Sequence, residues 1–174
     1  ICGSAKCSAH NWLFFESLSA ALDADSVFDG GRYTEYPEAG MNAFCAIYAA
    51  WAFSQEFFRQ EGFKNLGLES HKEIGSLLAQ FFVPQDPNDL LVRTRAWQNA
   101  DISDNPKYNG NLEAALAGIT ARAIVMPAST DQYFWSDDNK DEFARMPNAE
   151  FKEIPSIWGH AAGMGMDAAD RDFI

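Results

Sequence analysis

The sequence predicts an α/β fold that carries a mostly helical insertion. Three observations support this fold class. About a hundred residues with helical periodicity precede the last third of the chain. Two predicted strands, the apolar run 121–128 and the run 149–154, then follow. A helical stretch separates these runs, and the order strand, helix, strand is typical of a parallel sheet.

The helical part is predicted from apolar residues that recur every three or four positions, beginning with Trp12 and Phe15. Pro84 and Pro87 are expected to end one of these helices, because proline lacks the amide donor and clashes inside a helix. The predicted helices are a first one ending near residue 23, then 41–53, 54–62, 70–82, 89–99 and 112–117.

The last part of the chain is predicted to alternate strand and helix. Residues 121–128 form a short apolar run of the kind found in parallel strands that are covered on both faces, and residues 149–154 are predicted to form a second strand. Residues 140–146 are predicted to form the helix between them, and Pro147 with Asn148 turns the chain. A further helix is expected to begin near Asp170.

The composition favours a packed domain with no nucleic-acid or membrane partner. The chain has 174 residues, 47% of them hydrophobic, and a net charge of −12. Nucleic acids and anionic membranes bind clustered Lys and Arg, which this charge disfavours. No apolar run approaches the ~18 residues that a membrane span needs, and no signal peptide is recognisable. We therefore expect a cytoplasmic protein.

The cysteines Cys2, Cys7 and Cys45 are odd in number and show neither a CxxC motif nor zinc-ligand spacing. We expect reduced thiols, with no disulfide framework and no metal site. Cys45 lies in an apolar helical segment and is expected to be a small buried hydrophobic residue. The sequence contains no GxGxxG motif and no P-loop, so no bound cofactor is expected.

Two residues near the predicted strands are candidates for catalysis. Asp131 follows the first strand, at the carboxyl edge of the predicted sheet, where open α/β folds bind their ligands. His160 follows the second strand in a glycine-flanked loop. An acid and then a histidine, placed in this way, are two members of the catalytic triad of α/β-hydrolases. The alternatives are an ordinary turn or capping aspartate and an ordinary surface histidine.

The nucleophile that should precede these two residues is not recognisable. An α/β-hydrolase carries it in a G-x-S-x-G elbow between a strand and a helix. Ser4 is the nearest candidate, but Cys2 and Lys6 occupy the two outer positions of the motif. His10 and His71 are interpreted as non-catalytic. We therefore expect the chain to be the C-terminal part of an enzyme whose nucleophile lies outside it.

Several segments spread along the chain resemble the homoserine O-acetyltransferase-like branch of the α/β-hydrolase superfamily. They are Ile1 to Ala5, His10-Asn11, Tyr48 to Gln55, Met126 to Asp131, Tyr133-Phe134 and Ile154 to His160. The resemblance implies that residues 1–174 form the C-terminal portion of an α/β-hydrolase fold with a helical cap insertion. Within it, residues 1–11 are a strand end and loop, residues 12–110 the helical cap, and residues 111–174 the last strands and helices of the core.

In this family a serine attacks an acyl donor, forms an acyl-enzyme and passes the acyl group to a hydroxyl or to water. The resemblance implies that Asp131 is the triad acid and His160 the triad base, with the serine supplied from outside this chain. It also implies a small-molecule acyl donor and acceptor, with acetyl-CoA as a substrate and not as a bound cofactor. The chain departs from the family at Ala161-Ala162-Gly163, where homoserine acetyltransferases usually have an acidic and an aromatic residue.

The main hypothesis is therefore a fragment of a serine-dependent acyltransferase that is inactive by itself, since removing the nucleophile costs orders of magnitude in rate. One alternative is an esterase or other hydrolase of the same fold. A second is a non-catalytic interaction module, and a third is an all-helical binding protein in which the two strands are misread. The apolar segment 41–53 is expected to pack on its own core, and the alternative is a homodimer formed through the cap.

Overall fold

The computed structural model describes residues 3–174. Ile1 and Cys2, and with them the strand end expected at the start of the chain, lie outside the described residues. The chain folds into two compact units. Unit 1 comprises the described residues up to Lys6, Ala52–Gln60 and Ala100–Ile174, and unit 2 comprises Cys7–Trp51 and Glu61–Asn99. Residues 52–60, inside the range expected for the helical cap, thus pack with the region of the predicted strands.

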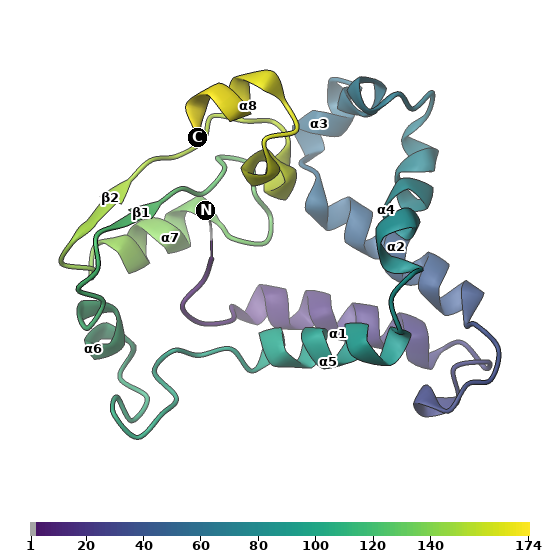
Figure 1. Ribbon diagram of the computed structural model, residues 1–174, viewed down its shortest axis with the longest axis horizontal. Helices are drawn as coiled ribbons and strands as arrows, with labels where there is room; N and C mark the ends of the chain where they lie inside the picture. The colour runs from purple at the N-terminus through teal and green to yellow at the C-terminus, as the bar shows by residue number, and fades with distance from the viewer. Residues whose placement is uncertain (1–2) are drawn as a thin grey trace. The chain divides into compact units, whose positions relative to one another are not determined.

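Unit 2 is helical (Figure 1). Its helix α1 (Ala9–Asp23) lies beside α5 (Pro87–Gln98). The other α-helices are α2 (Glu38–Ala52), whose last residue belongs to unit 1, and α4 (Ile74–Phe82). Three short 3₁₀ helices connect them: η1 (Asp29–Gly31), η2 (Gly62–Leu66) and η3 (His71–Glu73).

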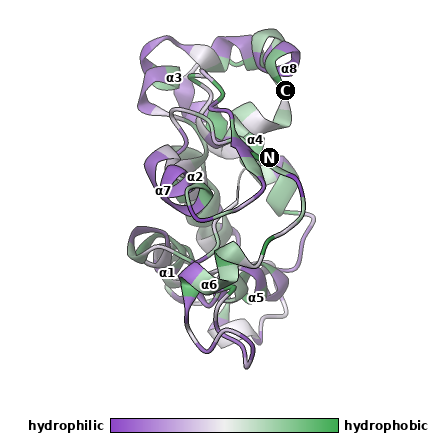
Figure 2. Ribbon diagram, turned by 90° about the vertical axis from the view of Figure 1, so that its left-hand side faces the viewer, coloured by the Kyte–Doolittle hydropathy of each residue, from purple (hydrophilic) through white to green (hydrophobic). Residues whose placement is uncertain are grey.

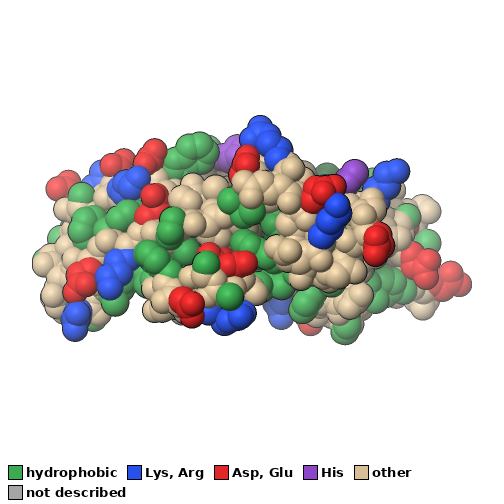
Figure 3. Space-filling view, turned by 90° about the horizontal axis from the view of Figure 1, so that it is seen from above, with side chains coloured by type: hydrophobic (Ala, Val, Ile, Leu, Met, Phe, Trp, Pro, Cys, Tyr) green, Lys and Arg blue, Asp and Glu red, His purple; other side chains and the backbone are tan. Residues whose placement is uncertain are grey.

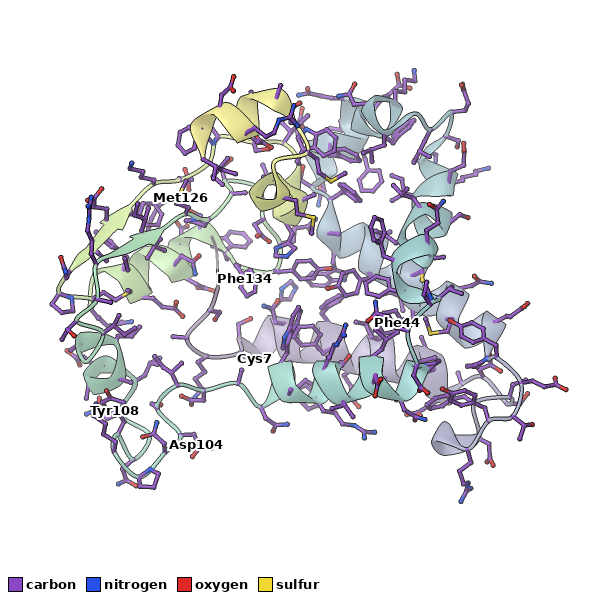
Figure 4. All side chains as sticks on the ribbon, in the orientation of Figure 1. Cys7, Phe44, Asp104, Tyr108, Met126 and Phe134 are labelled. Carbon is purple, nitrogen blue, oxygen red and sulfur yellow. The ribbon has the colours of Figure 1, made fainter. Side chains whose placement is uncertain are left out.

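The core of unit 2 combines aromatic and aliphatic side chains. Phe14 and Leu18 of α1 are almost completely buried. Phe44 of α2, labelled in Figure 4, packs against Phe82 of α4 with 5.4 Å between ring centroids. The next residue in the chain, Cys45, is also buried, as predicted. Burial raises the pKa of its thiol to about 11. The helical periodicity of the apolar residues in the sequence therefore corresponds to a packed apolar interior.

The start of α5 differs from the prediction, which placed it after Asn88. The carboxylate of Asp86 accepts a hydrogen bond from the Asn88 amide at 2.8 Å and caps the helix, so that Pro87 is its first residue. Proline is favoured at this position because a first-turn amide has no partner inside the helix, and the fixed φ of proline suits helical geometry. Pro87 therefore begins a helix instead of only ending the preceding one.

Unit 1 contains the two strands, β1 (Ala123–Val125) and β2 (Ala149–Phe151). Helix α7 (Ser136–Phe143) connects them and lies beside the sheet (Figure 1). This helix is hydrophilic over most of its length (Figure 2) and begins earlier than predicted, at residue 136. The other helices of the unit are α3 (Gln55–Arg59), α6 (Leu112–Ala117), η4 (Gly159–Met164) and α8 (Ala168–Phe173).

The two strands pair in parallel, as predicted, with Ala123 opposite Ala149. Both regular strands are shorter than the predicted runs, because Pro127 has no N–H group to continue the ladder. Pairing resumes beyond this proline, where Ala128 is bridged to Ile154. The Ile154 amide donates to the Pro127 carbonyl at 2.8 Å. The parallel alignment therefore extends to residues 128 and 154, at the carboxyl ends of the strands.

Polar contacts attach the first described residues to unit 1. The Ala5 amide donates to the carboxylate of Glu142 in α7 at 2.8 Å. Burial raises the pKa of Glu142 above its ordinary value, and the Ala5 amide opposes this effect. Lys6 forms an ion pair with Asp101, with 2.9 Å between Nζ and Oδ2. Hydrogen bonds from Ser103, together with this ion pair, lower the pKa of Asp101 to about 2.

The surface carries charges of both signs. On the face seen in Figure 3, Lys and Arg side chains are interspersed with Asp and Glu side chains. None of the helices within residues 3–174 is both long and apolar enough to cross a membrane.

We predict that Asp101→Asn lowers the free energy of unfolding at pH 7 by about 1 kcal/mol, because the ion pair and the charge-assisted bonds are lost. A carboxyl group with a depressed pKa stabilises the folded state above its ordinary pKa of 3.8 and loses this effect as the pH falls toward about 2. The difference between wild type and variant should therefore disappear between about pH 4 and about pH 2.

Chemical denaturation measured across this pH range tests the prediction. The exposed Asp104, also labelled in Figure 4, gives the matched control Asp104→Asn. A difference between Asp101→Asn and wild type that stays constant with pH would contradict the prediction.

Candidate active site

Asp131 lies in the loop that follows β1, and only 6% of its surface is exposed. Its Oδ1 atom accepts hydrogen bonds from the backbone amides of Tyr133 and Phe134, at 2.8 and 3.2 Å. Its Oδ2 atom lies 3.0 Å from Nδ1 of His160. The carboxylate is therefore oriented from two sides, by the backbone of its own loop and by the imidazole ring.

His160 lies in η4, after β2, and its side chain is 25% exposed. The ring packs edge-on against Tyr133 with 4.8 Å between centroids, and it packs at a tilt against Phe134 with 5.4 Å between centroids. Phe134, labelled in Figure 4, belongs to the loop between β1 and α7. Because Nδ1 is held by Asp131, Nε2 is the nitrogen that can accept a proton. The two residues singled out in the sequence thus form an acid–histidine pair.

A close backbone contact fixes the residue before His160. Gly159 has a φ of +61°, a conformation that residues with a side chain rarely adopt. A Cβ atom at this position would lie 2.8 Å from the amide nitrogen of Ser54 and 2.9 Å from the carbonyl oxygen of Ala52. The loop that contains His160, here called the histidine loop, approaches the backbone of the segment between α2 and α3. Only glycine at position 159 allows so close an approach.

Two side chains connect the same short segment to the two loops. The Ser54 hydroxyl donates to the carbonyl of Ile157, in the histidine loop, at 2.5 Å. Gln132 lies in the loop that contains Asp131, here called the aspartate loop, and its side-chain amide donates to the carbonyl of Phe53 at 2.9 Å. Residues 53 and 54 therefore contact the loops of both members of the pair.

Hydroxyl groups also join the two loops directly. Thr130 donates to the carbonyl of Ser156 at 2.7 Å and accepts a hydrogen bond from the amide of Gly159 at 3.1 Å. The Ser156 hydroxyl donates to the buried carboxylate of Asp170 at 2.8 Å and accepts from the Trp158 amide at 3.1 Å. Burial raises the pKa of Asp170 above its ordinary value, and the bond from Ser156 opposes this effect.

A cleft of about 550 Å³ lies beside Asp131 within unit 1. It is lined by the aspartate loop, by α3 with Arg59, and by the start of α7 with Trp135 and Lys140. Both cations form ion pairs with carboxylates on their own helices. The cleft therefore carries charges of both signs on its walls.

The other residues considered from the sequence lie elsewhere. Ser4 donates its hydroxyl hydrogen to a carbonyl in its own segment. His10 and His71 each pack against an aromatic ring of unit 2. Cys7 and Cys45 are free thiols, and Cys2 lies outside the described residues. Within residues 3–174, no group of three or more His, Cys, Asp or Glu side chains is arranged to hold a metal ion.

The sequence does not point to most of the residues that hold the pair in place. Thr130, Ser156 and Asp170 are short polar residues whose partners lie 14 to 29 positions away, so no local pattern marks them. Ser54 offers one signal, because serine directly before a helical segment is a common N-cap. Its hydroxyl does accept the Phe57 amide at 3.0 Å. The second bond of Ser54, across to the histidine loop, depends on the folded chain.

Proteins with similar sequences include esterases. No family model matches the chain. An ethyl acetate hydrolase of Pseudomonas veronii is 37% identical to it, over 99% of this chain and 50% of the hydrolase. A probable esterase of Corynebacterium glutamicum is also 37% identical, over 92% of this chain and 46% of the esterase. The solved structure of the acetyl esterase MekB matches 98% of this chain and 50% of its own, with a TM-score of 0.92 and 37% identity.

The chain belongs to the α/β-hydrolase superfamily. It has part of the α/β-hydrolase fold, as predicted, and it spans about half the length of the curated relatives it matches. The narrower assignment to the homoserine O-acetyltransferase-like branch has weaker support. A homoserine O-acetyltransferase of Chloroherpeton thalassium is 28% identical, and the structure of one from Bacillus anthracis is 21% identical with a TM-score of 0.78. At that identity the structural match shows the fold alone.

We predict that Gly159→Ala lowers the free energy of unfolding of this α/β-hydrolase chain by about 3 kcal/mol, through backbone strain and overpacking. The added Cβ atom would meet the backbone of residues 52–54, which cannot rotate away as a side chain can. Denaturant unfolding of the purified protein measures the effect.

Gly163→Ala is the matched control, since a Cβ atom there meets no atom within 4 Å. We expect it to change stability by less than about 0.5 kcal/mol. Equal effects of the two substitutions would contradict the account of Gly159.

Proposed function

We propose that this chain supplies the acid and the histidine of the catalytic triad in an esterase that hydrolyses acetyl esters of small alcohols. The observation that carries the proposal is the 3.0 Å contact between Asp131 and Nδ1 of His160. The identity of 37% to an ethyl acetate hydrolase, and to the acetyl esterase MekB, supports the substrate class. The nucleophile is proposed to be a serine outside these 174 residues, since the matched relatives are about twice as long.

In the proposed mechanism, the serine Oγ attacks the carbonyl carbon of the ester while His160 takes the serine proton on Nε2. The tetrahedral intermediate then breaks its bond to the alkoxy group, and His160 returns the proton to the departing alcohol. Water attacks the acetyl-enzyme with the same histidine as base, which releases acetate and restores the serine. Throughout, Asp131 keeps Nδ1 protonated and stabilises the imidazolium that forms.

Acetyl transfer to a hydroxyl acceptor is the second candidate, because it proceeds through the same acyl-enzyme. The relatives named as homoserine acyltransferases are 24% and 28% identical to the chain. Both relatives at 37% identity carry hydrolase or esterase names, and this difference favours water as the acceptor. With water as acceptor, acetyl-CoA is not needed as the donor.

We predict that the protein carrying this chain hydrolyses ethyl acetate and p-nitrophenyl acetate. His160→Ala and Asp131→Asn should each lower kcat by about 10³-fold or more. The first variant removes the base from both halves of the reaction, and the second removes the group that orients it. Released acid is titrated at constant pH, and transfer from acetyl-CoA to homoserine is assayed in parallel.

His71→Ala is the matched control, because His71 is an exposed histidine of unit 2. We expect it to keep kcat within about two-fold of wild type. Normal kcat in either variant of the pair would exclude the triad role. Acetyl transfer that is faster than hydrolysis would favour the acyltransferase, and a folded protein with neither activity would favour the non-catalytic interaction module.

A further inference from the structure

We propose that Thr130 is a positioning residue for the acid–histidine pair: its hydroxyl group joins the loop of Asp131 to the loop of His160 and sets how the two side chains meet. The catalytic consequence of this inference rests on the proposed function. The structural part rests on the geometry of the described residues.

The position of Thr130 in the chain gives it direct control over both loops. It immediately precedes Asp131, and its hydroxyl accepts the amide of Gly159, which immediately precedes His160. The same hydroxyl donates to the carbonyl of Ser156, at 2.7 Å. A threonine hydroxyl has one hydrogen to donate and lone pairs to accept with. Thr130 uses its hydroxyl both as donor and as acceptor, and both partners lie in the loop that contains His160.

The Ser156 end of this link is held independently of Thr130. The Ser156 side chain is buried, donates to Asp170 and accepts the Trp158 amide. Its carbonyl also accepts a weaker bond from the Ser129 hydroxyl, at 3.3 Å. If the Thr130 hydroxyl were removed, the Ser156 carbonyl would still accept the hydrogen bond from Ser129 and would keep its position in the loop.

The Gly159 end depends on Thr130 more strongly. Gly159 is buried, and its position against the backbone of residues 52–54 leaves it little room to turn. Without the hydroxyl, its amide would lose the acceptor that lies 3.1 Å away. A buried N–H group without an acceptor is unfavourable, so the loop would shift to find one. That shift would be passed directly to the neighbouring residue, His160.

The reaction is sensitive to such a shift. The bond between Asp131 and His160 depends on distance and angle, as hydrogen bonds weaken steeply when they are misaligned. A misplacement of about 1 Å can cost about 10²-fold in rate. Substrate contacts made elsewhere would be unchanged. A positioning role for Thr130 therefore predicts an effect on kcat with little effect on KM.

The experiment compares Thr130→Val with Thr130→Ser in the protein that carries the whole of this chain. Valine keeps the branched shape and removes the hydroxyl, whereas serine keeps the hydroxyl. With ethyl acetate as substrate, we expect the valine variant to lose about ten-fold in kcat with KM within about two-fold. The serine variant should stay within about three-fold of wild type.

A second measurement reports on the contact between Asp131 and His160 and does not require catalytic activity. The Nδ1 proton of His160, held by Asp131, should give a low-field proton resonance in ¹⁵N-histidine-labelled protein, assigned by its loss in Asp131→Asn. We expect this resonance to shift or broaden in Thr130→Val and to return in Thr130→Ser.

Thr94→Val is the matched control. Thr94 is a buried threonine of unit 2 whose hydroxyl donates to the Leu90 carbonyl at 2.8 Å, so the same substitution removes a comparable bond. We expect lower stability in this variant, with kcat and the His160 resonance unchanged.

Each outcome bears on the proposal. Wild-type values of both readouts in Thr130→Val would overturn it, and so would equal losses in the valine and serine variants. If Thr130→Val does not fold, Thr130→Ala removes the same hydroxyl with less bulk and gives the same test. If the wild-type protein hydrolyses no acetyl ester, the proposed function fails, and the resonance still decides whether Thr130 positions the pair.

Discussion

The parallel pairing of residues 123–128 with residues 149–154 determines where the site can form. Parallel strands end at the same edge of a sheet, so the loops that leave them begin side by side. Here the pairing continues past Pro127 to the bridge between Ala128 and Ile154. Asp131 and His160 follow shortly after these two bridged residues. An acid and a histidine that are 29 positions apart in sequence therefore meet at 3.0 Å.

Pairing alone does not hold the two loops at a fixed separation, because neither loop is a regular strand. Side-chain hydroxyls do this instead: Thr130 bonds to the backbone of the loop of His160 at Ser156 and Gly159, and Ser54 bonds to it at Ile157. Such bonds have narrow distance and angle limits, whereas apolar contacts tolerate sliding. The aromatic rings of Tyr133 and Phe134 then close over the imidazole. The site combines directional hydrogen bonds between its loops with packing of aromatic rings against the imidazole.

Much of the fold was predictable because the signals are local. Helical periodicity and turn residues lie within a few positions of each other, and the strand–helix–strand order near the end of the chain identified the parallel pair. The lengths of the strands were overestimated because Pro127, which cannot donate to the ladder, lies within the first predicted strand. The pairing of Asp131 with His160 could be expected from the order of elements.

The rest of the site depends on contacts between distant residues. Nothing in the sequence near Ser54 or Thr130 shows that their hydroxyls reach the histidine loop, since the partners lie far along the chain. Contacts with distant residues likewise place residues 52–60 in unit 1. Short segments also could not identify the branch of the superfamily, because esterases and a homoserine O-acetyltransferase share the fold of this chain.

Residues 52–60 divide unit 2 into two separate stretches of chain, before and after them. The helices of unit 2 therefore cannot be exchanged as one continuous cassette without also removing Phe53 and Ser54. A recombinant made with single crossovers at the outer limits of the helical block would leave Gly159 without its backbone neighbour, and Gln132 and Ile157 without their hydrogen-bond partners. Modular variation of this helical region, in evolution or in design, is restricted to exchanges that retain this nine-residue segment in place.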